Sequence, residues 1–190
     1  MKSLKLFMLI LGCRPANRLT EQHDIFFGIG YSLIDLLPGI FKFWPEAKQK
    51  IHIDAWREVT QVDGYKIEVV ERHNAGQTET IKLFFINLGG YKAGEFEEYH
   101  YKILMATADK GVAVKRSKET AFYKHTSFAG ATSHIDDKYG VDVDDIHEIK
   151  DILTDALKNK YSIQLMAVTE IREDKLHIGY LPLSKLEMSY

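Results

Sequence analysis

Two glutamate–histidine pairs are the residues of this chain best suited to do chemistry. Both have the spacing Glu-x-His: Glu21 with His23, and Glu98 with His100. Each pair falls where a predicted loop enters a predicted strand, and the two-residue period of a strand puts both side chains of a pair on one face. If the two pairs converge, their imidazoles and carboxylates suit a zinc, manganese or iron ion. The same groups also suit general acid–base catalysis.

A structural role competes with this chemistry and is the interpretation we favour. The glutamate of each pair can hold its histidine in one tautomer while the imidazole bonds to the backbone of its own repeat. Structural ion pairs imitate functional sites, and a role in folding would keep the motif in both halves of the chain. The same choice applies to two His-Ile-Asp segments, His52 with Asp54 and His134 with Asp136. Each would orient an imidazole toward a ligand or cap a turn, and the structural role is again favoured.

Other signatures of catalysis or cofactor binding are missing from the sequence. No serine or cysteine stands in a nucleophile elbow, and the aspartates between positions 136 and 151 do not have the spacing of an EF-hand loop. The segment Gly28-Ile29-Gly30 lacks the third glycine of a dinucleotide fingerprint. The sequence therefore assigns no cofactor, no metal and no catalytic residue, and whether the protein is an enzyme stays open.

The two Glu-x-His pairs belong to stretches that match each other at a constant offset. Segments 5–23 and 82–100 align without a gap, so that Lys5 matches Lys82 and His23 matches His100. They are identical at eight of nineteen positions, where composition alone gives about one. Shorter matches follow at an offset of 82 for the His-Ile-Asp segments and at an offset of 96 further along the chain. We therefore predict a duplicated unit with a first repeat at 1–77 and a second at 78–190, related by a pseudo-two-fold axis and packed as one globular body.

The first repeat is predicted to contain two strands, a helix and two more strands. The apolar run at residues 4–11 indicates a central strand, and residues 23–31 a second one. Ser32 can cap a helix that extends to about residue 42, in which Pro38 predicts a kink or a late start. Two further strands within residues 51–70 are expected to meet at an Asp-Gly turn.

The second repeat is predicted to follow the same order with longer connections. Strands are expected at 81–88 and 99–107, and a helix at 109–124. A C-terminal hairpin is expected to join residues 161–169 to residues 176–183. The predicted fold class is α+β, with tandem strand-strand-helix-strand-strand units and a largely antiparallel sheet.

Composition and charge narrow the classes of partner. The 190 residues are 45% hydrophobic and 27% charged, which is ordinary for a globular protein. A formal net charge of -2 argues against a broad basic surface for nucleic acid or an anionic membrane. The single cysteine, Cys13, allows no internal disulfide and favours the cytoplasm. The short apolar run before Cys13 is interpreted as a strand and not as a lipoprotein signal, because it recurs at residues 82–89.

The matched motifs resemble one known family. The motifs of its first copy are Lys5-Leu6-Phe7-Met8, Glu21-x-His23-Asp24, His52-Ile53-Asp54 and Asp63-Gly64-Tyr65; those of its second are Leu83-Phe84-Phe85-x-Asn87-Leu88-Gly89-Gly90-Tyr91, Glu98-x-His100 and the acidic segment Asp136–Asp145. Over most of residues 4–170 the chain resembles two copies of the bacterial domain of unknown function 1543. Cys13 departs from the glycine pair that stands at Gly89-Gly90. The resemblance implies a bacterial origin and an uncharacterised role, and it supplies no catalytic residues.

These observations predict a non-catalytic cytoplasmic protein that binds a small molecule or another protein in the groove between its two repeats. An exposed strand edge would also support a homodimer, whereas a membrane is not expected as a partner and nucleic acid is disfavoured. The alternative is a metal-dependent or acid–base enzyme that acts on a small molecule through the paired Glu-x-His motifs. The candidate binding residues are Glu21, His23, Glu98, His100, His52, Asp54, His134 and Asp136.

Overall fold

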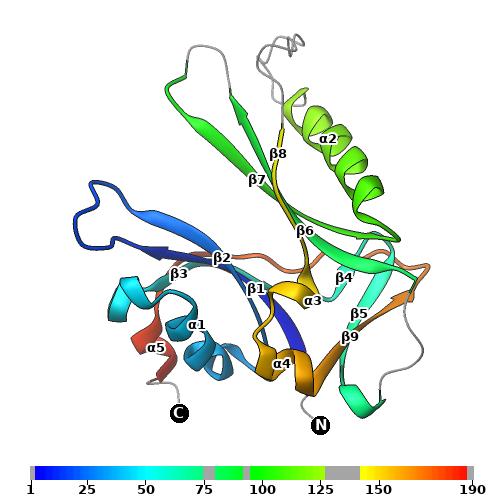
Figure 1. Ribbon diagram of the computed structural model, residues 1–190, viewed down its shortest axis with the longest axis horizontal. Helices are drawn as coiled ribbons and strands as arrows, with labels where there is room; N and C mark the ends of the chain where they lie inside the picture. Colours follow the sequence, from blue (N-terminus) through cyan, green and yellow to red (C-terminus); the bar gives the residue numbers. More distant parts are fainter. Residues whose placement is uncertain (1–2, 75–79, 92–94, 127–141, 188–190) are drawn as a thin grey trace. The chain divides into compact units, whose positions relative to one another are not determined.

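The computed structural model describes residues 3–74, 80–91, 95–126 and 142–187. Its fold is α+β, as the sequence predicts, and all paired strands in these residues run antiparallel. Contacts divide the chain into two compact units, which we call unit 1 (Met1–Gly76 with Leu153–Tyr190) and unit 2 (Gln77–Ile152) (Figure 1).

Unit 1 contains a four-stranded sheet in the order β10-β3-β1-β2. Its strands are β1 (Lys5–Cys13), β2 (Gln22–Gly30), β3 (His52–Glu58) and β10 (His177–Pro182). Strand β1 is central, as its unbroken apolar sequence predicts, and most of its side chains are buried on both faces. Residues of β2 and β3 therefore lie on either side of β1.

One face of this sheet carries the core of unit 1. The helical segments η1 (Leu33–Leu36), α1 (Leu37–Phe43), η2 (Pro45–Lys50) and α5 (Leu183–Glu187) contribute to that core (Figure 1). Alternate β1 residues, which point to one face of the strand, pack against them. The buried cluster consists of Phe7, Leu9, Leu11, Cys13, Phe26, Leu36, Leu37, Ile40, Ala47, Ile51, Ile53 and Leu183. The intervening residues of β1, including Gly12, therefore face the other way.

The helix after β2 begins as predicted and is interrupted near its proline. Ser32 and Asp35 form a capping box, with the Ser32 N–H donating to Asp35 Oδ2 at 2.8 Å. The first turn is 3-10 helix, and α1 follows with Pro38 in its own first turn. Proline is tolerated there because its missing N–H would have no partner inside the helix.

A second sheet of unit 1 has the order β4-β5-β9. Its strands are β4 (Gln61–Val62), β5 (Tyr65–Glu71) and β9 (Tyr161–Ala167), with η3 (Arg72–Asn74) after β5 and α4 (Asp155–Lys160) before β9. Strands β4 and β5 form the predicted Asp-Gly hairpin. Asp63 (φ 51°) and Gly64 (φ 78°) are both left-handed, as a type I′ turn requires.

The predicted C-terminal hairpin is wrong, because its two strands belong to different sheets. Strand β9 pairs with β5, and β10 pairs with β3. Polar anchors hold the intervening segment: the Thr60 N–H and Oγ1 donate to Asp174 Oδ1 at 2.9 and 2.5 Å, and the Arg172 N–H donates to Gln61 Oε1 at 2.8 Å. A polar stretch between two strands has the same sequence pattern whether the chain turns back in a hairpin or crosses to another sheet. The spacing of the two strands therefore could not distinguish a hairpin from a crossover.

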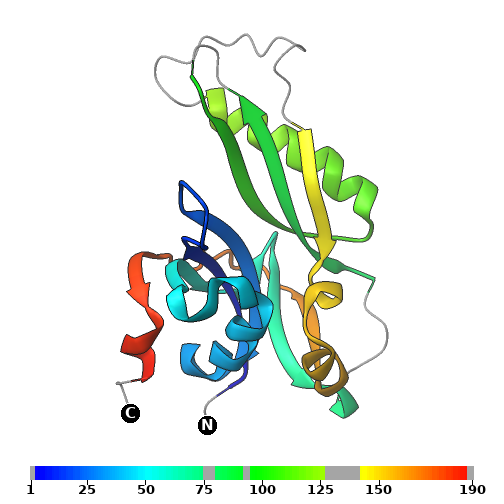
Figure 2. The same ribbon diagram turned by 60° about the vertical axis from the view of Figure 1, so that its left-hand side comes forward.

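Unit 2 is a three-stranded sheet in the order β7-β6-β8, and a long helix covers it (Figure 2). Its elements are β6 (Lys82–Tyr91), β7 (Glu98–Thr107), α2 (Lys110–Thr126), β8 (Asp142–Glu148) and α3 (Ile149–Ile152). Asp109 caps α2 as predicted, because its Oδ1 accepts the Val112 N–H at 2.9 Å. Neither α2 nor another helix of the described residues is long and apolar enough to cross a membrane.

The central strands of the two units share a pairing pattern. Lys5 opens the β1–β2 pairing, and its sequence match Lys82 opens the β6–β7 pairing. The β1–β3 register shifts after Ile10, and the β6–β8 register shifts after Asn87, which is the residue that aligns with Ile10. The pairing start and the register shift of unit 2 therefore follow those of unit 1 at the same offset as the sequence match. The repeat boundary at 77/78 stays a prediction, and residues 153–190, predicted to belong to the second repeat, fall in unit 1.

Candidate functional site

Two histidines flank one glycine on three neighbouring strands of unit 1. Gly12 of β1 lies opposite His23 of β2 and opposite His52 of β3. Directly opposed residues of an antiparallel sheet project on the same face. Both imidazoles therefore lie on the face of Gly12, opposite to the face that carries the helices.

A β-bulge brings an aspartate to the same place. The β1–β3 register joins Leu11 to Ile53 and Ile10 to Ala55, which leaves Asp54 without an opposing residue. Bulges redirect side chains and are frequent near functional sites. Asp54 follows His52 by two residues, so the strand period puts both side chains on one face.

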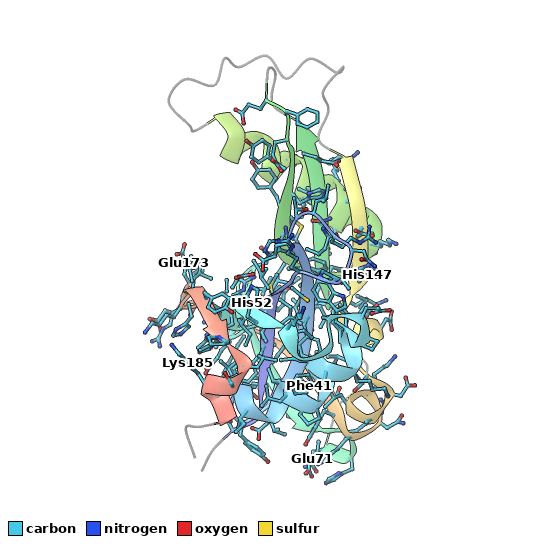
Figure 3. The ribbon with its side chains drawn as sticks, turned by 90° about the vertical axis from the view of Figure 1, so that its left-hand side faces the viewer. Phe41, His52, Glu71, His147, Glu173 and Lys185 are labelled. Atoms are coloured by element: carbon cyan, nitrogen blue, oxygen red, sulfur yellow. The ribbon has the colours of Figure 1, made fainter. Side chains whose placement is uncertain are left out.

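Four side chains form a closed ring of contacts. One of them is His52, the first residue of β3, which is labelled in Figure 3. His52 Nε2 is 3.1 Å from Glu21 Oε1 and 3.3 Å from Asp54 Oδ1. His23 Nε2 is 3.3 Å from Asp54 Oδ2 and 3.8 Å from Glu21 Oε2. Each carboxylate thus contacts both imidazoles through different oxygens. We call Glu21, His23, His52 and Asp54 the His–carboxylate cluster.

The cluster has a buried end and an exposed end. The His52 side chain is 7% exposed and its ring lies 4.4 Å from the Tyr180 ring, whereas the His23 and Glu21 side chains are nearly half exposed. Asp54 Oδ2 is buried without a hydrogen-bond partner among the described residues, although His23 Nε2 is 3.3 Å away. A buried acceptor without a partner costs about 1–3 kcal/mol, which functional sites tolerate.

This arrangement can exchange protons and can present polar atoms to a ligand. Imidazole and carboxylate groups are the side chains that most often serve as general acids and bases, and the cluster brings both types together. In the residues that the structure describes, no group of three or more His, Cys, Asp or Glu side chains is arranged to hold a metal ion.

Gly12 is needed because the cluster lies against the β1 backbone. A Cβ atom at this position would come closer than 3.0 Å to both His52 Nε2 and Asp54 Oδ2, a separation that real Cβ atoms essentially never show. A glycine in a strand often marks such a close approach. The glycine that ends the apolar run in the sequence thus makes room for the side chains of the cluster.

Unit 2 places residues of the second Glu-x-His pair in a similar register. His100 of β7 and Asp142 of β8 lie opposite Gly89 of β6, on its two sides. Glu98 lies at the start of β7. The approach of this pair to Glu21 and His23 of unit 1 stays a prediction.

The second predicted His-Ile-Asp segment, His134 with Asp136, lies outside the described residues. In unit 2 the β8 residue opposite Gly89 is Asp142, in the register position that His52 has opposite Gly12 in unit 1. The predicted match of this segment to His52 and Asp54 stays a prediction.

A hollow of about 560 Å³ opens beside the buried end of the cluster. Its volume lies within the range of about 300–1,000 Å³ that is common for small-molecule sites. We call it the loop hollow, because most of its lining comes from the loop between β1 and β2. It is lined by Arg14, Pro15, Ala16, Asn17, Arg18, Glu21, Lys50, His52 and Tyr180.

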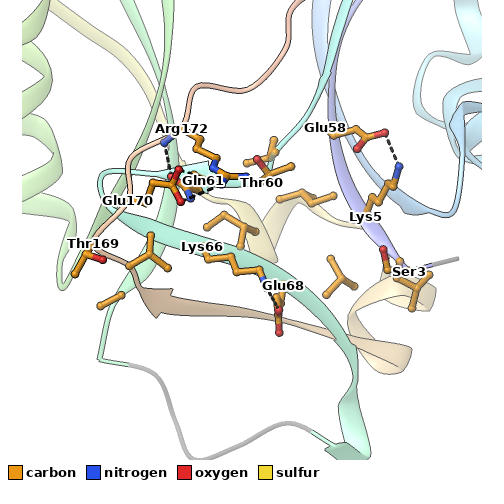
Figure 4. A pocket seen from close by; sticks show the side chains of 17 residues that line it. Ser3, Lys5, Glu58, Thr60, Gln61, Lys66, Glu68, Thr169, Glu170 and Arg172 are labelled. Atoms are coloured by element: carbon orange, nitrogen blue, oxygen red, sulfur yellow. Dashed lines mark hydrogen bonds and ion pairs between the residues drawn. The ribbon is translucent and has the colours of Figure 1, made fainter. Parts of the chain in front are cut away.

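A larger hollow of about 1130 Å³ in unit 1 differs in its charges (Figure 4). All of its charged lining residues are paired with one another: Lys5 with Glu58, Lys66 with Glu68, and Arg172 with Glu170. Charges that neutralise each other leave little attraction for an ionic ligand. We therefore take the loop hollow and the His–carboxylate cluster as the candidate site.

All four residues of the cluster are among the candidates predicted from the sequence, but no sequence pattern placed them together. The sequence left open a meeting of the Glu21–His23 pair with its copy and favoured a structural role within its own repeat; in unit 1 this pair contacts His52 and Asp54. The Glu-x-His and His-Ile-Asp motifs lie at the starts of the two strands that pair with β1, and this arrangement would have indicated that their side chains meet. No sequence pattern pointed to Tyr180, because β10 reaches β3 only through the crossover between the two sheets.

Comparisons with known proteins give a partial family match and a similar solved structure. Residues 18–69, less than a third of the chain, match the model of a family described as Domain of Unknown Function (DUF1543), and all four cluster residues fall in this segment. The predicted second copy stays a prediction. The crystal structure of protein Il1583 from Idiomarina loihiensis is similar in fold, with a TM-score of 0.59, 24% identity, and coverage of 95% of this chain and 97% of that chain. No curated protein matches the chain.

Proposed function

We propose that this protein binds a small molecule in the loop hollow, with the His–carboxylate cluster as the polar end of the site. The observation that carries the proposal is the meeting of His23, His52, Glu21 and Asp54 beside a hollow of ligand size. Ligand sites combine a concave surface with a few precisely placed polar groups. The groove between repeats, predicted from the sequence as the binding surface, stays a prediction.

The buried end of the cluster is well suited to orient a ligand. His52 is held between two carboxylates and the Tyr180 ring, so its imidazole loses little further freedom when a ligand binds. The exposed halves of His23 and Glu21 leave an approach from solvent. This combination supports binding without requiring a chemical step.

An acid–base enzyme acting on a small molecule is the second candidate. The contacts of His52 Nε2 with Glu21 and Asp54 favour it, because they place an imidazole beside two carboxylates, the groups that most often serve as general acids and bases. Turnover of a bound molecule that is lost in His52→Gln, while binding persists, would select this function over simple binding. The metal-dependent form of this candidate is tested by metal content.

The proposal is tested by screening small metabolites against tag-free protein by thermal shift, with affinities then measured by calorimetry. His52→Gln is the test variant. His73→Gln is the matched control, because His73 is exposed and lies in η3, outside the lining of the hollow. We expect at least one ligand that binds the control like wild type and binds His52→Gln about tenfold more weakly, as loss of one hydrogen bond to the ligand would produce.

Two results would contradict the proposal. Ligands that bind His52→Gln and wild type equally would place binding elsewhere, provided that circular dichroism shows the variant to be folded. One transition metal ion per chain, measured by elemental analysis and lost in His52→Gln but kept in His73→Gln, would assign the cluster to metal binding instead.

We also infer that the chain is a duplication of one unit, which the sequence predicts to be strand-strand-helix-strand-strand. The offset that aligns Lys5 with Lys82 is common to the sequence match and to both strand registers, which supports this inference. In the second sheet, Glu68 lies opposite Gln164, its predicted counterpart at an offset of 96, as a local two-fold relation would place them. Bacterial origin, cytoplasmic location and a homodimer stay predictions from the sequence.

A further inference from the structure

Three cationic residues line the loop hollow. Arg14 and Arg18 come from the β1–β2 loop, and Lys50 ends η2. The one carboxylate in the lining is Glu21, which contacts the imidazoles of the cluster. Within the described ranges, no salt bridge joins these three cations to an aspartate or glutamate. This differs from the larger hollow of unit 1, where every charged lining residue is paired.

A tight turn holds the two arginines together. The Arg18 N–H donates to the Pro15 carbonyl at 3.3 Å, and Asn17 has a left-handed φ of 65°. A positive φ at the third position is typical of a type II turn, and asparagine tolerates it well. Arg14 Nε donates to the Arg18 carbonyl at 3.3 Å, which ties the first guanidinium to the turn that carries the second.

The net positive charge of this lining favours the binding of an anion. The lining contains three cations and one carboxylate, that of Glu21, so its formal net charge is two positive when histidine is counted as neutral. The chain as a whole has a formal net charge of -2 on the same count. Like charges held near each other repel, and a bound anion removes that cost. Guanidinium groups bind phosphate through paired, charge-assisted hydrogen bonds. A phosphate dianion therefore matches both the charge and the donors of the lining.

We propose that the loop hollow binds the phosphate group of a small phosphorylated molecule, a specificity that rests on the proposed binding function. Arg14, Arg18 and Lys50 bind the phosphate. The volume of about 560 Å³ leaves room for an organic part beyond the phosphate. That part lies toward the ring of Tyr180, which is 68% exposed and packs against His52.

The test compares phenyl phosphate, inorganic phosphate and phenol as probes in calorimetric titrations at constant ionic strength. Arg18→Gln/Lys50→Gln removes two cations of the lining. Lys42→Gln/Lys175→Gln is the control, because it removes the same charge from exposed positions of unit 1 outside the hollow. We expect phenyl phosphate to bind wild type and the control equally, and to bind Arg18→Gln/Lys50→Gln about tenfold more weakly or worse. Phenol should bind much more weakly than phenyl phosphate.

The outcomes separate this inference from the function on which it rests. Equal affinity of phenyl phosphate for the lining variant and the control overturns the phosphate site. If inorganic phosphate binds as tightly as phenyl phosphate, the proposal that the hollow also binds an organic part of the ligand is overturned. If a screened metabolite loses affinity in His52→Gln but not in Arg18→Gln/Lys50→Gln, the proposed function stands and the phosphate specificity fails. If neither variant weakens any ligand, both fail.

Discussion

Gly12→Ala tests whether the His–carboxylate cluster depends on close approach to the β1 backbone. The added Cβ would come closer than 3.0 Å to His52 Nε2 and Asp54 Oδ2. His52 has little free space into which it can move, because its side chain is 7% exposed, and Asp54 Oδ2 is itself buried although its side chain is 30% exposed. The methyl group must therefore displace at least one member of the ring of contacts.

The sign of the stability change separates this clash from the intrinsic preference of the backbone. Glycine within a strand is less favourable than alanine by about 0.5–1 kcal/mol, so without a clash the substitution would stabilise the protein by that amount. Overpacking a filled site costs about 1–3 kcal/mol. The expected net result is a loss of about 0.5–2 kcal/mol in the free energy of unfolding.

The assay is urea unfolding in two backgrounds, read as a double-mutant cycle. In the His52→Ala/Asp54→Ala background the two clashing groups are gone, so Gly12→Ala should stabilise by about 0.5–1 kcal/mol. The difference between backgrounds should therefore be about 1–3 kcal/mol. The same loss in both backgrounds, or a gain in wild type, would refute the close approach of the cluster to Gly12.

Two further predictions concern buried polar groups of unit 1. Asp174→Ala should lower the free energy of unfolding by about 1–2 kcal/mol, because the Thr60 N–H loses its acceptor; the exposed neighbour Glu173→Ala should change it by less than about 0.5 kcal/mol, and equal effects would refute the anchor. Burial raises the pKa of the Cys13 thiol and outweighs the lowering effect of Lys50, so native protein should react with iodoacetamide more slowly than unfolded protein. Because the folded thiol keeps its proton to higher pH than the unfolded thiol, the free energy of unfolding should fall as pH rises above about 8.5. Cys13→Ala should lack this part of the fall, and an equal fall in both proteins would contradict the assignment.

Local chemistry made parts of the fold predictable. The apolar run of β1, the capping box at Ser32, the proline in α1 and the turn at Asp63 each depend on neighbours a few residues away. Such features obey short-range rules of period, capping and backbone conformation. The pairing of β10 with β3 depends on residues more than a hundred positions apart, and no local rule identifies that partner.

The α+β class, the central position of β1 and the cluster residues of unit 1 could all be predicted from the sequence. Residue type, strand period and short motifs are local properties, and they do not depend on how the elements later pack. The contacts of Glu21 and His23 with His52 and Asp54 could not be predicted in this way, because they depend on the strand register and the bulge on either side of β1. The same holds for Lys50 and Tyr180, because the hollow is formed by segments that are distant in sequence and that the burial of the core brings together.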